Sequence, residues 1–155
     1  MIHIFDLDDT LLPSNSYNKY ADIVPNNLLI KLLSEIKYKY IFTNGTIGHA
    51  YDALSHMKLP IFDYIFARDN LYKNQRIKPY IDPYIFIMKT IFPNGYNKNI
   101  DIIFYDDILN NLKTAKHLNW TTVWINSSCE DPPYYIDYKF DTIIDALLFF
   151  NYSIL

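Results

Sequence analysis

The chain has 155 residues, of which 50% are hydrophobic and 20% are charged, a composition typical of one globular domain with a full core. Its net charge of -3 gives no overall field that attracts polynucleotides, and its single cysteine, Cys129, excludes an internal disulfide. No Cys/His cluster suggests a zinc site, and no apolar run reaches the length of a membrane span. We therefore expect one domain over residues 1–155 that makes no contact with a membrane.

The residue usage bears on the source of the chain, and its N-terminus and its single cysteine bear on the cellular compartment. Ile, Asn and Lys are abundant and only three glycines are present, a bias typical of an A+T-rich genome such as those of some large viruses. The chain opens in an apolar segment without a cleavable signal pattern. We therefore expect the reducing environment of the cytoplasm, or of the host cytoplasm if the source is viral.

Apolar runs of strand character alternate along the chain with segments of helical periodicity. The first run, residues 2–6, predicts a strand, and residues 11–25 follow as a polar loop. Apolar positions at helical spacing predict helices over residues 26–37, 47–57, 81–92, 109–118 and 142–150. Shorter apolar runs predict further strands over residues 38–42, 64–67, 100–105 and 121–125. Strands that alternate with helices in this way imply right-handed crossovers and a mostly parallel sheet.

Asp6 and Asp8 stand at the end of the first predicted strand. Because alternate strand side chains point the same way, the two carboxylates can converge on one spot just past the strand. Carboxylates held together repel each other unless a cation lies between them, and a hard divalent ion such as Mg²⁺ prefers such oxygen ligands. A helix N-terminus with acidic caps is the alternative interpretation.

A hydroxyl and an amide follow the strand predicted over residues 38–42, in the segment Thr43-Asn44-Gly45. The next residue, Thr46, lies near a predicted helix N-terminus, a place that suits a phosphate group. An ordinary turn with a helix cap is the alternative. The segment is therefore a candidate phosphate site.

Lys78 and the pair Asp106-Asp107 complete the polar set. A lysine in a loop is usually only solvated, and adjacent acids after a strand are commonly helix caps. The conjunction is nevertheless far rarer than any single member, because all these groups stand at or beside strand ends, where parallel sheets bind ligands. Together they supply an anionic metal cage, a hydroxyl donor and a compensating cation, a set that suits phosphoryl transfer.

With these motifs the chain resembles the haloacid dehalogenase (HAD) superfamily of Rossmann-like phosphohydrolases over nearly its whole length. The run FDLDDT matches the first family motif, Asp-x-Asp-x-Thr, and Thr43-Asn44-Gly45 after its strand is similar to the second. Lys78 in Ile-Lys-Pro is similar to the third motif, and Tyr105-Asp106-Asp107 with Asn111 to the fourth. The resemblance implies an α/β fold, a three-layer Rossmann-like (HAD-like) domain with a mostly parallel central sheet. Residues 61–86 further resemble the subgroup of nucleotidases and other small-molecule phosphatases.

The resemblance also implies the reaction, which is Mg²⁺-dependent hydrolysis of a phosphomonoester through an aspartyl-phosphate intermediate. Asp6 would be the nucleophile, and Asp8 would act first as general acid and then as general base. Lys78 would neutralise Asp6 and the phosphoryl oxygens. By the same resemblance, true dehalogenases carry Tyr at the position of Asp8 and transport ATPases carry Thr, so Asp8 argues against carbon–halogen chemistry.

Two ligand sets follow from the resemblance. Asp6, the Asp8 backbone carbonyl and Asp107 would hold Mg²⁺, with Asp106 as a direct or an outer ligand. The transferring phosphoryl group would be bound by backbone N–H groups together with Thr43, Asn44 and Lys78. Ile108 departs from the family pattern, in which a small polar residue often follows the acid pair, and this change would weaken the hydrogen bonding around the acids.

The chain leaves no room for the cap domain that many HAD proteins insert. The segments between Thr10 and Thr43 and between Thr43 and Lys78 each hold a predicted helix and a predicted strand. An independently folded unit seldom needs fewer than about 40 residues. We therefore expect a short flap over residues 11–25, which contains Tyr17 and Tyr20, in place of a cap.

An open site of this kind admits several phosphorylated substrates. Nucleoside monophosphates are the first candidates among small phosphate esters, followed by a nucleic-acid end such as a polynucleotide 3′-phosphate and then by a phosphoprotein. A second copy in a homo-oligomer would be another source of a lid. The residues Arg68, Tyr72, Lys73 and Arg76 precede Lys78 and form either a cationic, aromatic rim for substrate or an ordinary solvated loop.

The remaining histidines and tryptophans have structural interpretations. His49, His56 and His117 lie on helical patterns, and we predict no catalytic role for them. Trp120 and Trp124 alternate within apolar segments, which places them in the core.

Two alternatives that are not enzymes use similar residues. A receiver domain also carries an acid pair, a Thr and a Lys, but there the acid pair closes the first strand and the phosphorylated Asp comes later, whereas here an acid pair follows Lys78. A phosphate-binding module that has lost turnover is the other alternative, although every catalytic position is present.

Overall fold

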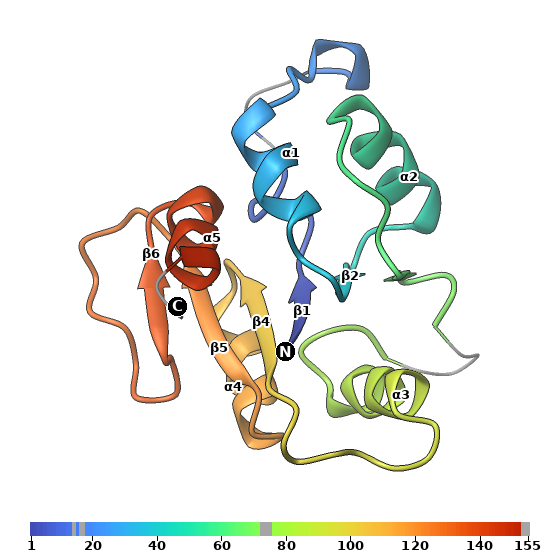
Figure 1. The fold of residues 1–155 in the computed structure, drawn as a ribbon, viewed down its shortest axis with the longest axis vertical. Coiled ribbons are helices and arrows are strands. Elements are labelled where there is room, and N and C mark those ends of the chain that lie inside the picture. The colour runs from blue at the N-terminus through green and yellow to red at the C-terminus, as the bar shows by residue number, and fades with distance from the viewer. Residues whose placement is uncertain (14, 16–17, 72–75, 153–155) are drawn as a thin grey trace.

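A computed structural model describes the chain except for residues 14, 16–17, 72–75 and 153–155 (Figure 1). Its six strands form one sheet in the order β3-β2-β1-β4-β5-β6, and all neighbouring pairs are parallel. The strands are β1 (Ile2–Phe5), β2 (Lys39–Phe42), β3 (Tyr64–Phe66), β4 (Ile102–Asp106), β5 (Thr121–Ile125) and β6 (Tyr138–Phe140). The helices are α1 (Asn27–Ser34), α2 (Ile47–His56), α3 (Ile81–Ile91), α4 (Leu109–His117) and α5 (Ile143–Tyr152), with a short 3-10 helix, η2 (Tyr20–Asp22), in the flap. The predicted α/β, Rossmann-like fold is confirmed.

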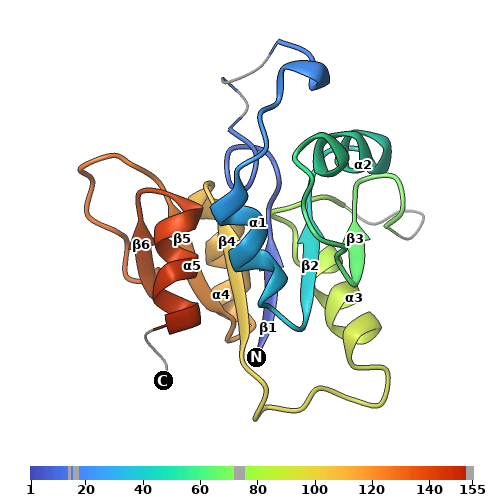
Figure 2. The ribbon, with the colours of Figure 1, turned by 45° about the horizontal axis from the view of Figure 1, so that its top comes forward.

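The sheet is the middle of three layers, because buried strands present apolar side chains to both faces. Helices α1, α2 and α5 pack on one face, against a cluster that includes Phe5 and Tyr105. Helices α3 and α4 pack on the other face, against a cluster that includes Phe42 and Phe104. Figure 2 shows α1 and α5 in front of the sheet and α3 and α4 behind it.

The sheet reverses its direction of growth at β1. From β1 the chain builds outward through β2 to β3, and then crosses back to place β4, β5 and β6 on the opposite side. The carboxyl ends of β2, β1 and β4 therefore lie side by side at the point where parallel α/β sheets bind ligands. The flap that carries η2 rises beyond this edge of the sheet (Figure 2).

Side-chain caps begin two helices near this edge. Asn26 accepts a hydrogen bond of 3.0 Å from the Leu29 N–H at the start of α1. Thr46 accepts one of 3.2 Å from the His49 N–H at the start of α2. The second cap begins α2 directly after the loop that follows β2 and places His49 in the first turn of the helix.

The structure contains two elements that the sequence patterns did not predict. Strand β6 pairs in parallel with β5, but its residues are half-buried or exposed, so they lack the apolar run that marks an inner strand. The short helix η2 lies within the segment predicted as a polar loop, and it carries Tyr20. Tyr17, the other tyrosine of the predicted flap, lies outside the described residues.

The described residues between the strands form the flap and the crossover helices, and they build no separate cap over the carboxyl edge. Trp120 and Trp124 are buried, as predicted. Among the described helices, none combines the length and the apolar character that a membrane span requires.

Candidate active site

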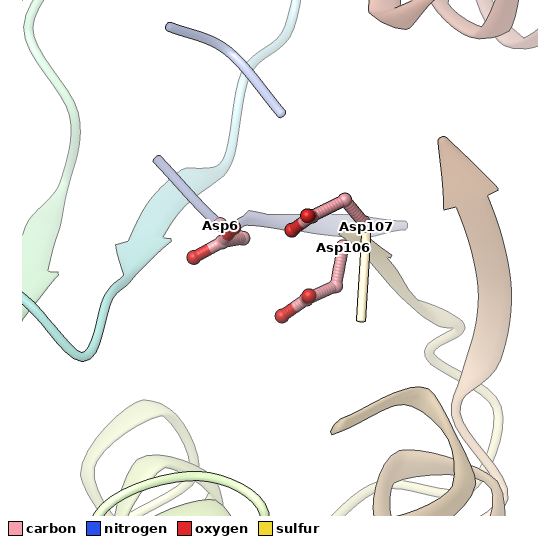
Figure 3. A group of neighbouring side chains, drawn as sticks. All are labelled: Asp6, Asp106 and Asp107. Carbon is pink, nitrogen blue, oxygen red and sulfur yellow. The ribbon is translucent and has the colours of Figure 1, made fainter. Parts of the chain in front are cut away.

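Three carboxylates meet at the carboxyl ends of β1 and β4 (Figure 3). Asp6 directly follows β1, Asp106 is the last residue of β4, and Asp107 comes next. One oxygen from each side chain lies within 4.8 Å of the other two. Phe5 pairs with Tyr105 in the parallel register of β1 and β4, which brings the two acidic segments side by side.

The ammonium group of Lys78 lies between two of these carboxylates. Its Nζ donates to Asp6 Oδ1, to Asp106 Oδ2 and to the carbonyl oxygen of Phe42, each at 2.8 Å. Lys78 is only 3% exposed, and these three bonds use all three of its ammonium protons. A residue that sequence alone places in a polar loop is therefore the buried cation of the cluster.

Asn44 holds the loop that carries Lys78. Its side-chain amide donates a 3.1 Å hydrogen bond to the Lys78 carbonyl and accepts one of 3.0 Å from the Lys78 N–H. This pair of bonds ties the segment after β2 to the segment before α3. Asn44 thus places the lysine, a task that the sequence did not indicate, while its contact with phosphate stays a prediction.

The crowding of negative charge shifts the pKa values of the cluster. Burial, and then the charge of Asp106, raise the pKa of Asp6 to about 8 although Lys78 opposes the shift. Burial and Asp106 likewise raise the pKa of Asp107 to about 6. Burial alone would lower the pKa of Lys78, but the charges of Asp106 and Asp6 outweigh burial and raise that pKa. The upward shifts of Asp6 and Lys78 are consistent with each other. Two carboxylates face Lys78 and stabilise its charged form, whereas Asp6 shares that one ammonium group with Asp106 and is only partly compensated.

This charge distribution fits a hard divalent cation. One ammonium group does not neutralise three carboxylates, and the ligand atoms that the three aspartates offer are all oxygens, which such ions prefer. Asp106 is already engaged, because its Oδ1 accepts from the Ile108 N–H at 2.8 Å and its Oδ2 accepts from the Asn111 amide at 3.0 Å. Asp6 and Asp107 are therefore the better candidates for direct ligands.

The Ile108 side chain does not disturb this arrangement. It is 50% exposed, and the bond that residue 108 gives to Asp106 comes from its backbone. The departure from the family pattern at this position therefore leaves the acid pair with a hydrogen-bond donor.

A cavity of about 140 Å³ lies beside the cluster, and all predicted site residues except the fully buried Asp106 line it. Thr43 is buried at its edge and accepts a 3.0 Å hydrogen bond from the Gly45 N–H. A side chain at position 45 would crowd this wall, because its Cβ would lie 3.2 Å from Thr43 Oγ1 and 3.2 Å from a carbon of the His49 ring. The cavity is of a size to hold a phosphoryl group, not a whole large substrate.

Asp8 lines the same cavity, but its carboxylate is not part of the three-aspartate cluster. Strand β1 ends at Phe5, and the N–H groups of Thr10, Leu11 and Leu12 all bond to the Leu7 carbonyl in a tight turn. The alternation of a strand therefore stops before Asp8, and its side chain turns toward α2. There Asp8 Oδ1 meets Nε2 of His49 at 2.8 Å.

His49 is the functional candidate that sequence reasoning missed. Its second ring nitrogen, Nδ1, lies 2.6 Å from the hydroxyl of Tyr20 in the flap. Helical periodicity describes only which face of a helix is apolar, and it does not reveal a partner on another segment. The signal that would have found it is the cap at Thr46, which begins α2 beside the site and puts His49 in the first turn.

The proposed basic rim is only partly described. Arg68 and Arg76 are exposed, and the Arg76 guanidinium lies 4.6 Å from the centroid of the Tyr80 ring. Tyr72 and Lys73 lie outside the described residues. A substrate contact by this loop therefore stays a prediction.

No protein-family model matches this chain, and no curated protein is significantly similar to it.

Comparison of the fold, in contrast, finds clear neighbours among solved structures. A magnesium-bound structure of YfnB from Bacillus subtilis, assigned as a HAD-hydrolase, has a TM-score of 0.63 at 21% identity, and the match covers 79% of this chain and 52% of YfnB. An L-2-haloacid dehalogenase from Xanthobacter autotrophicus has a TM-score of 0.65 at 14% identity, with 86% and 63% covered. SP0104 from Streptococcus pneumoniae, a haloacid dehalogenase-like family hydrolase, has a TM-score of 0.65 at 15% identity, with 96% and 97% covered. The chain thus spans about half the length of YfnB and nearly all of SP0104, and it has the fold of the haloacid dehalogenase-like hydrolases.

Proposed function

We propose that the chain is a hydrolase of the HAD superfamily that removes phosphate from phosphomonoesters through an aspartyl-phosphate at Asp6, with Mg²⁺ as its metal. The observation that carries the proposal is that the carboxylates at this edge of the sheet form two separate groups. Asp6, Asp106 and Asp107 form one cluster, in which Lys78 bonds to Asp6 and Asp106, while Asp8 stands apart on the wall of the same cavity. The cluster suits a divalent cation that, together with Lys78, offsets the charge of a phosphoryl group, and the separate carboxyl suits proton transfer.

The reaction proceeds in two half-reactions. In the first, an oxygen of the Asp6 carboxylate bonds to phosphorus while the bond from phosphorus to the ester oxygen breaks, and Asp8 gives its proton to that leaving oxygen. In the second, water attacks the phosphorus of the aspartyl-phosphate, and Asp8 takes a proton from the water. The bond between Asp6 and phosphorus then breaks, which releases inorganic phosphate and restores both aspartates.

The other residues hold charge and position. Lys78 neutralises Asp6 and the phosphoryl oxygens, and the Thr43 hydroxyl and backbone N–H groups at the end of β2 orient them. We assign the Asp6 and Asp107 carboxylates and the Asp8 backbone carbonyl to the metal, with Asp106 as an outer partner. When bound, Mg²⁺ supplies positive charge that keeps Asp6 ionised and offsets the charge of the phosphoryl group.

Asp8 favours phosphate esters over haloacids as substrates. Dehalogenases are among the similar folds, but the resemblance described above gives them Tyr where this chain has Asp8. A carboxyl group at this position can exchange a proton with a leaving oxygen, which phosphate transfer requires and displacement of halide does not.

For the substrate, we propose a nucleoside monophosphate, with a polynucleotide 3′-phosphate second and a phosphoprotein third. The resemblance of residues 61–86 to nucleotidases and the exposed Arg68 and Arg76 support this order. The described residues form no cap, so few groups can contact the part of a small substrate remote from phosphorus, and we expect weak selectivity. A second copy of the chain that covers the site would raise the selectivity among substrates.

The test is a phosphate-release screen of the purified protein with Mg²⁺ or with EDTA. It compares nucleoside monophosphates, sugar phosphates, 3′-phosphorylated oligonucleotides and phosphopeptides, with halide release from 2-haloacids as a separate arm and Asp6→Asn as the blank. We expect phosphate release that needs both Mg²⁺ and Asp6, with nucleotides preferred. Halide release, or phosphate release that survives both EDTA and the Asp6 change, would refute the proposal. A sugar phosphate strongly preferred over every nucleotide and oligonucleotide would overturn the substrate order alone.

A further inference from the structure

A chain of hydrogen bonds runs from the flap to the proposed acid. The Tyr20 hydroxyl lies 2.6 Å from Nδ1 of His49, and Nε2 of the same ring lies 2.8 Å from Asp8 Oδ1. The three side chains come from three separate segments, which are the flap helix η2, the first turn of α2 and the turn after β1. None of these contacts involves Lys78 or any of the three clustered aspartates.

Asp8 needs such a support. Its side chain is 38% exposed, and the turn after β1 leaves it beyond the end of the strand. An exposed carboxylate samples several rotamers, and ordering it for proton transfer costs conformational entropy. The imidazole of His49 occupies Oδ1 and thereby selects one orientation of the carboxyl group.

The orientation that His49 selects is the useful one. With Oδ1 taken by the imidazole, the other oxygen, Oδ2, is the one closer to the loop after β2, where a Cβ built on Gly45 would lie 3.6 Å from it. That loop carries Thr43, which lines the same cavity. Oδ2 is therefore the oxygen placed to exchange a proton with a group bound in the cavity.

Tyr20 in turn fixes the imidazole. The Tyr20 ring stacks on the ring of His56, which lies in α2 like His49, with the centroids 5.8 Å apart and the planes at 26°. The flap therefore rests on α2 at this point. Because Asp8 accepts from Nε2, a neutral His49 carries its proton there and accepts the Tyr20 hydroxyl at Nδ1. The flap therefore takes part in setting the position of Asp8.

We propose that His49 is a positioning residue for Asp8 and that Tyr20 links the flap to this function. The inference rests on the proposed function, since it assumes that Asp8 transfers the proton to the leaving group. It goes beyond that function because it assigns a role to α2 and to the flap, which contribute none of the residues proposed to hold the metal or the phosphoryl group.

Two substitutions of His49 by amides of similar polarity distinguish a role in positioning Asp8 from a role in folding stability alone. In His49→Gln the amide nitrogen stands at the reach of Nε2 and can still donate to Asp8. In His49→Asn the amide nitrogen takes the place of Nδ1 and is too far from Asp8 to donate to it. Tyr20→Phe removes only the hydroxyl and keeps the ring that stacks on His56, and His117→Asn, at an exposed histidine of α4, is the matched control.

The assay compares kcat and KM for p-nitrophenyl phosphate, whose leaving group needs little protonation, with those for an alkyl phosphate, whose leaving group needs a proton. For His49→Asn we expect kcat on the alkyl ester to fall about 10- to 100-fold with unchanged KM, because a misplaced catalytic group costs rate and not binding. In the first turnover, the rate of p-nitrophenol release should fall less, because only the later hydrolysis of the intermediate then needs Asp8. His49→Gln should restore most of the rate, Tyr20→Phe should lie between, and the control should match the wild type.

The outcomes separate the inference from the function on which it rests. A wild-type protein without phosphate release that depends on Mg²⁺ and Asp6 refutes the proposed function and the inference together. With an active wild type, the inference alone is refuted if His49→Asn keeps full activity, if it slows formation of the intermediate equally from both substrates, or if His49→Gln is no better than His49→Asn. If His49→Asn fails to fold by circular dichroism, a Tyr20→Phe protein with unchanged rate on the alkyl ester refutes the link to the flap, and an inactive, folded His49→Gln refutes the positioning.

Discussion

We predict that Asp6→Asn makes the metal-free protein more stable than the wild type at neutral pH, and that this gain vanishes in acid. Burial and Asp106 raise the pKa of Asp6 from 3.8 to about 8 in the folded protein. The folded state therefore keeps a proton that the unfolded chain has already released. A carboxyl group of this kind contributes stability below its unfolded pKa, and that contribution is lost as the pH rises through the folded pKa.

The size of the effect follows from the two pKa values. Between them, each pH unit costs about 1.4 kcal/mol of folding free energy per carboxyl group. From about pH 5 to about pH 7 the wild type should thus lose up to about 3 kcal/mol through Asp6. Asn cannot ionise, yet its side-chain oxygen can still accept from Lys78. The pKa of Asp107 is raised chiefly by burial and by Asp106, which both proteins keep, and only the smaller contribution of its hydrogen bond with Asp6 differs between them.

Urea unfolding in EDTA at these two pH values measures the difference, with the fluorescence of the buried Trp120 and Trp124 as the signal. Asp131→Asn, at an exposed aspartate of the loop before β6, is the matched control and should follow the wild type. Adding Mg²⁺ at neutral pH should stabilise the wild type more than Asp6→Asn, because binding to the folded state alone raises its stability. A gain from Asp6→Asn that does not grow with pH would show that the crowded carboxylates do not carry the charge assigned to them.

Three further changes test the rest of the site. Asp8→Asn should slow both half-reactions by about 10²- to 10⁴-fold, measured as pre-steady-state and steady-state release of product, and an unchanged turnover number would exclude Asp8 as the acid and base. Asp107→Ala should remove the Mg²⁺ dependence and the rate together, and calorimetry that finds Mg²⁺ affinity intact would place the ion elsewhere. Lys78→Met should cost about 3 to 5 kcal/mol in urea unfolding at pH values where Asp6 and Asp106 are ionised, because two buried carboxylates lose their shared cation. A Lys78→Met protein as stable as the wild type in alkaline buffer would contradict the ion-pair geometry.

The sequence predicts the positions of the clustered acids well because the carboxyl ends of parallel strands all lie at the same edge of the sheet. Apolar runs that end in acids located Asp6 and the pair Asp106-Asp107, and the parallel register of β1 and β4 then brought them together. Strand β6 escaped prediction because its three residues lie half-buried or exposed at an edge, where no apolar run is needed.

The details that depend on long-range contacts were not predictable from local patterns. Nothing near Lys78 indicates that its ammonium group is buried against Asp6, since the contact spans distant parts of the chain. Period-two alternation placed Asp8 beside Asp6, but the turn at Leu7 directs its side chain to His49. The role of Tyr20 depends on the contact between the flap and α2, which no local pattern in the sequence indicates.

The most direct test of the central claim is to trap the covalent intermediate. Asp8→Asn protein, mixed with p-nitrophenyl phosphate and Mg²⁺ and quenched in acid, should accumulate a phosphoryl group, because the leaving group needs little protonation while hydrolysis of the intermediate lacks its base. Peptide mapping by mass spectrometry should place it on Asp6, and borohydride, which reduces an acyl phosphate, should convert that residue to homoserine. Release of p-nitrophenol with no trapped phosphoryl group, or with the group on another residue, would contradict Asp6 as the nucleophile.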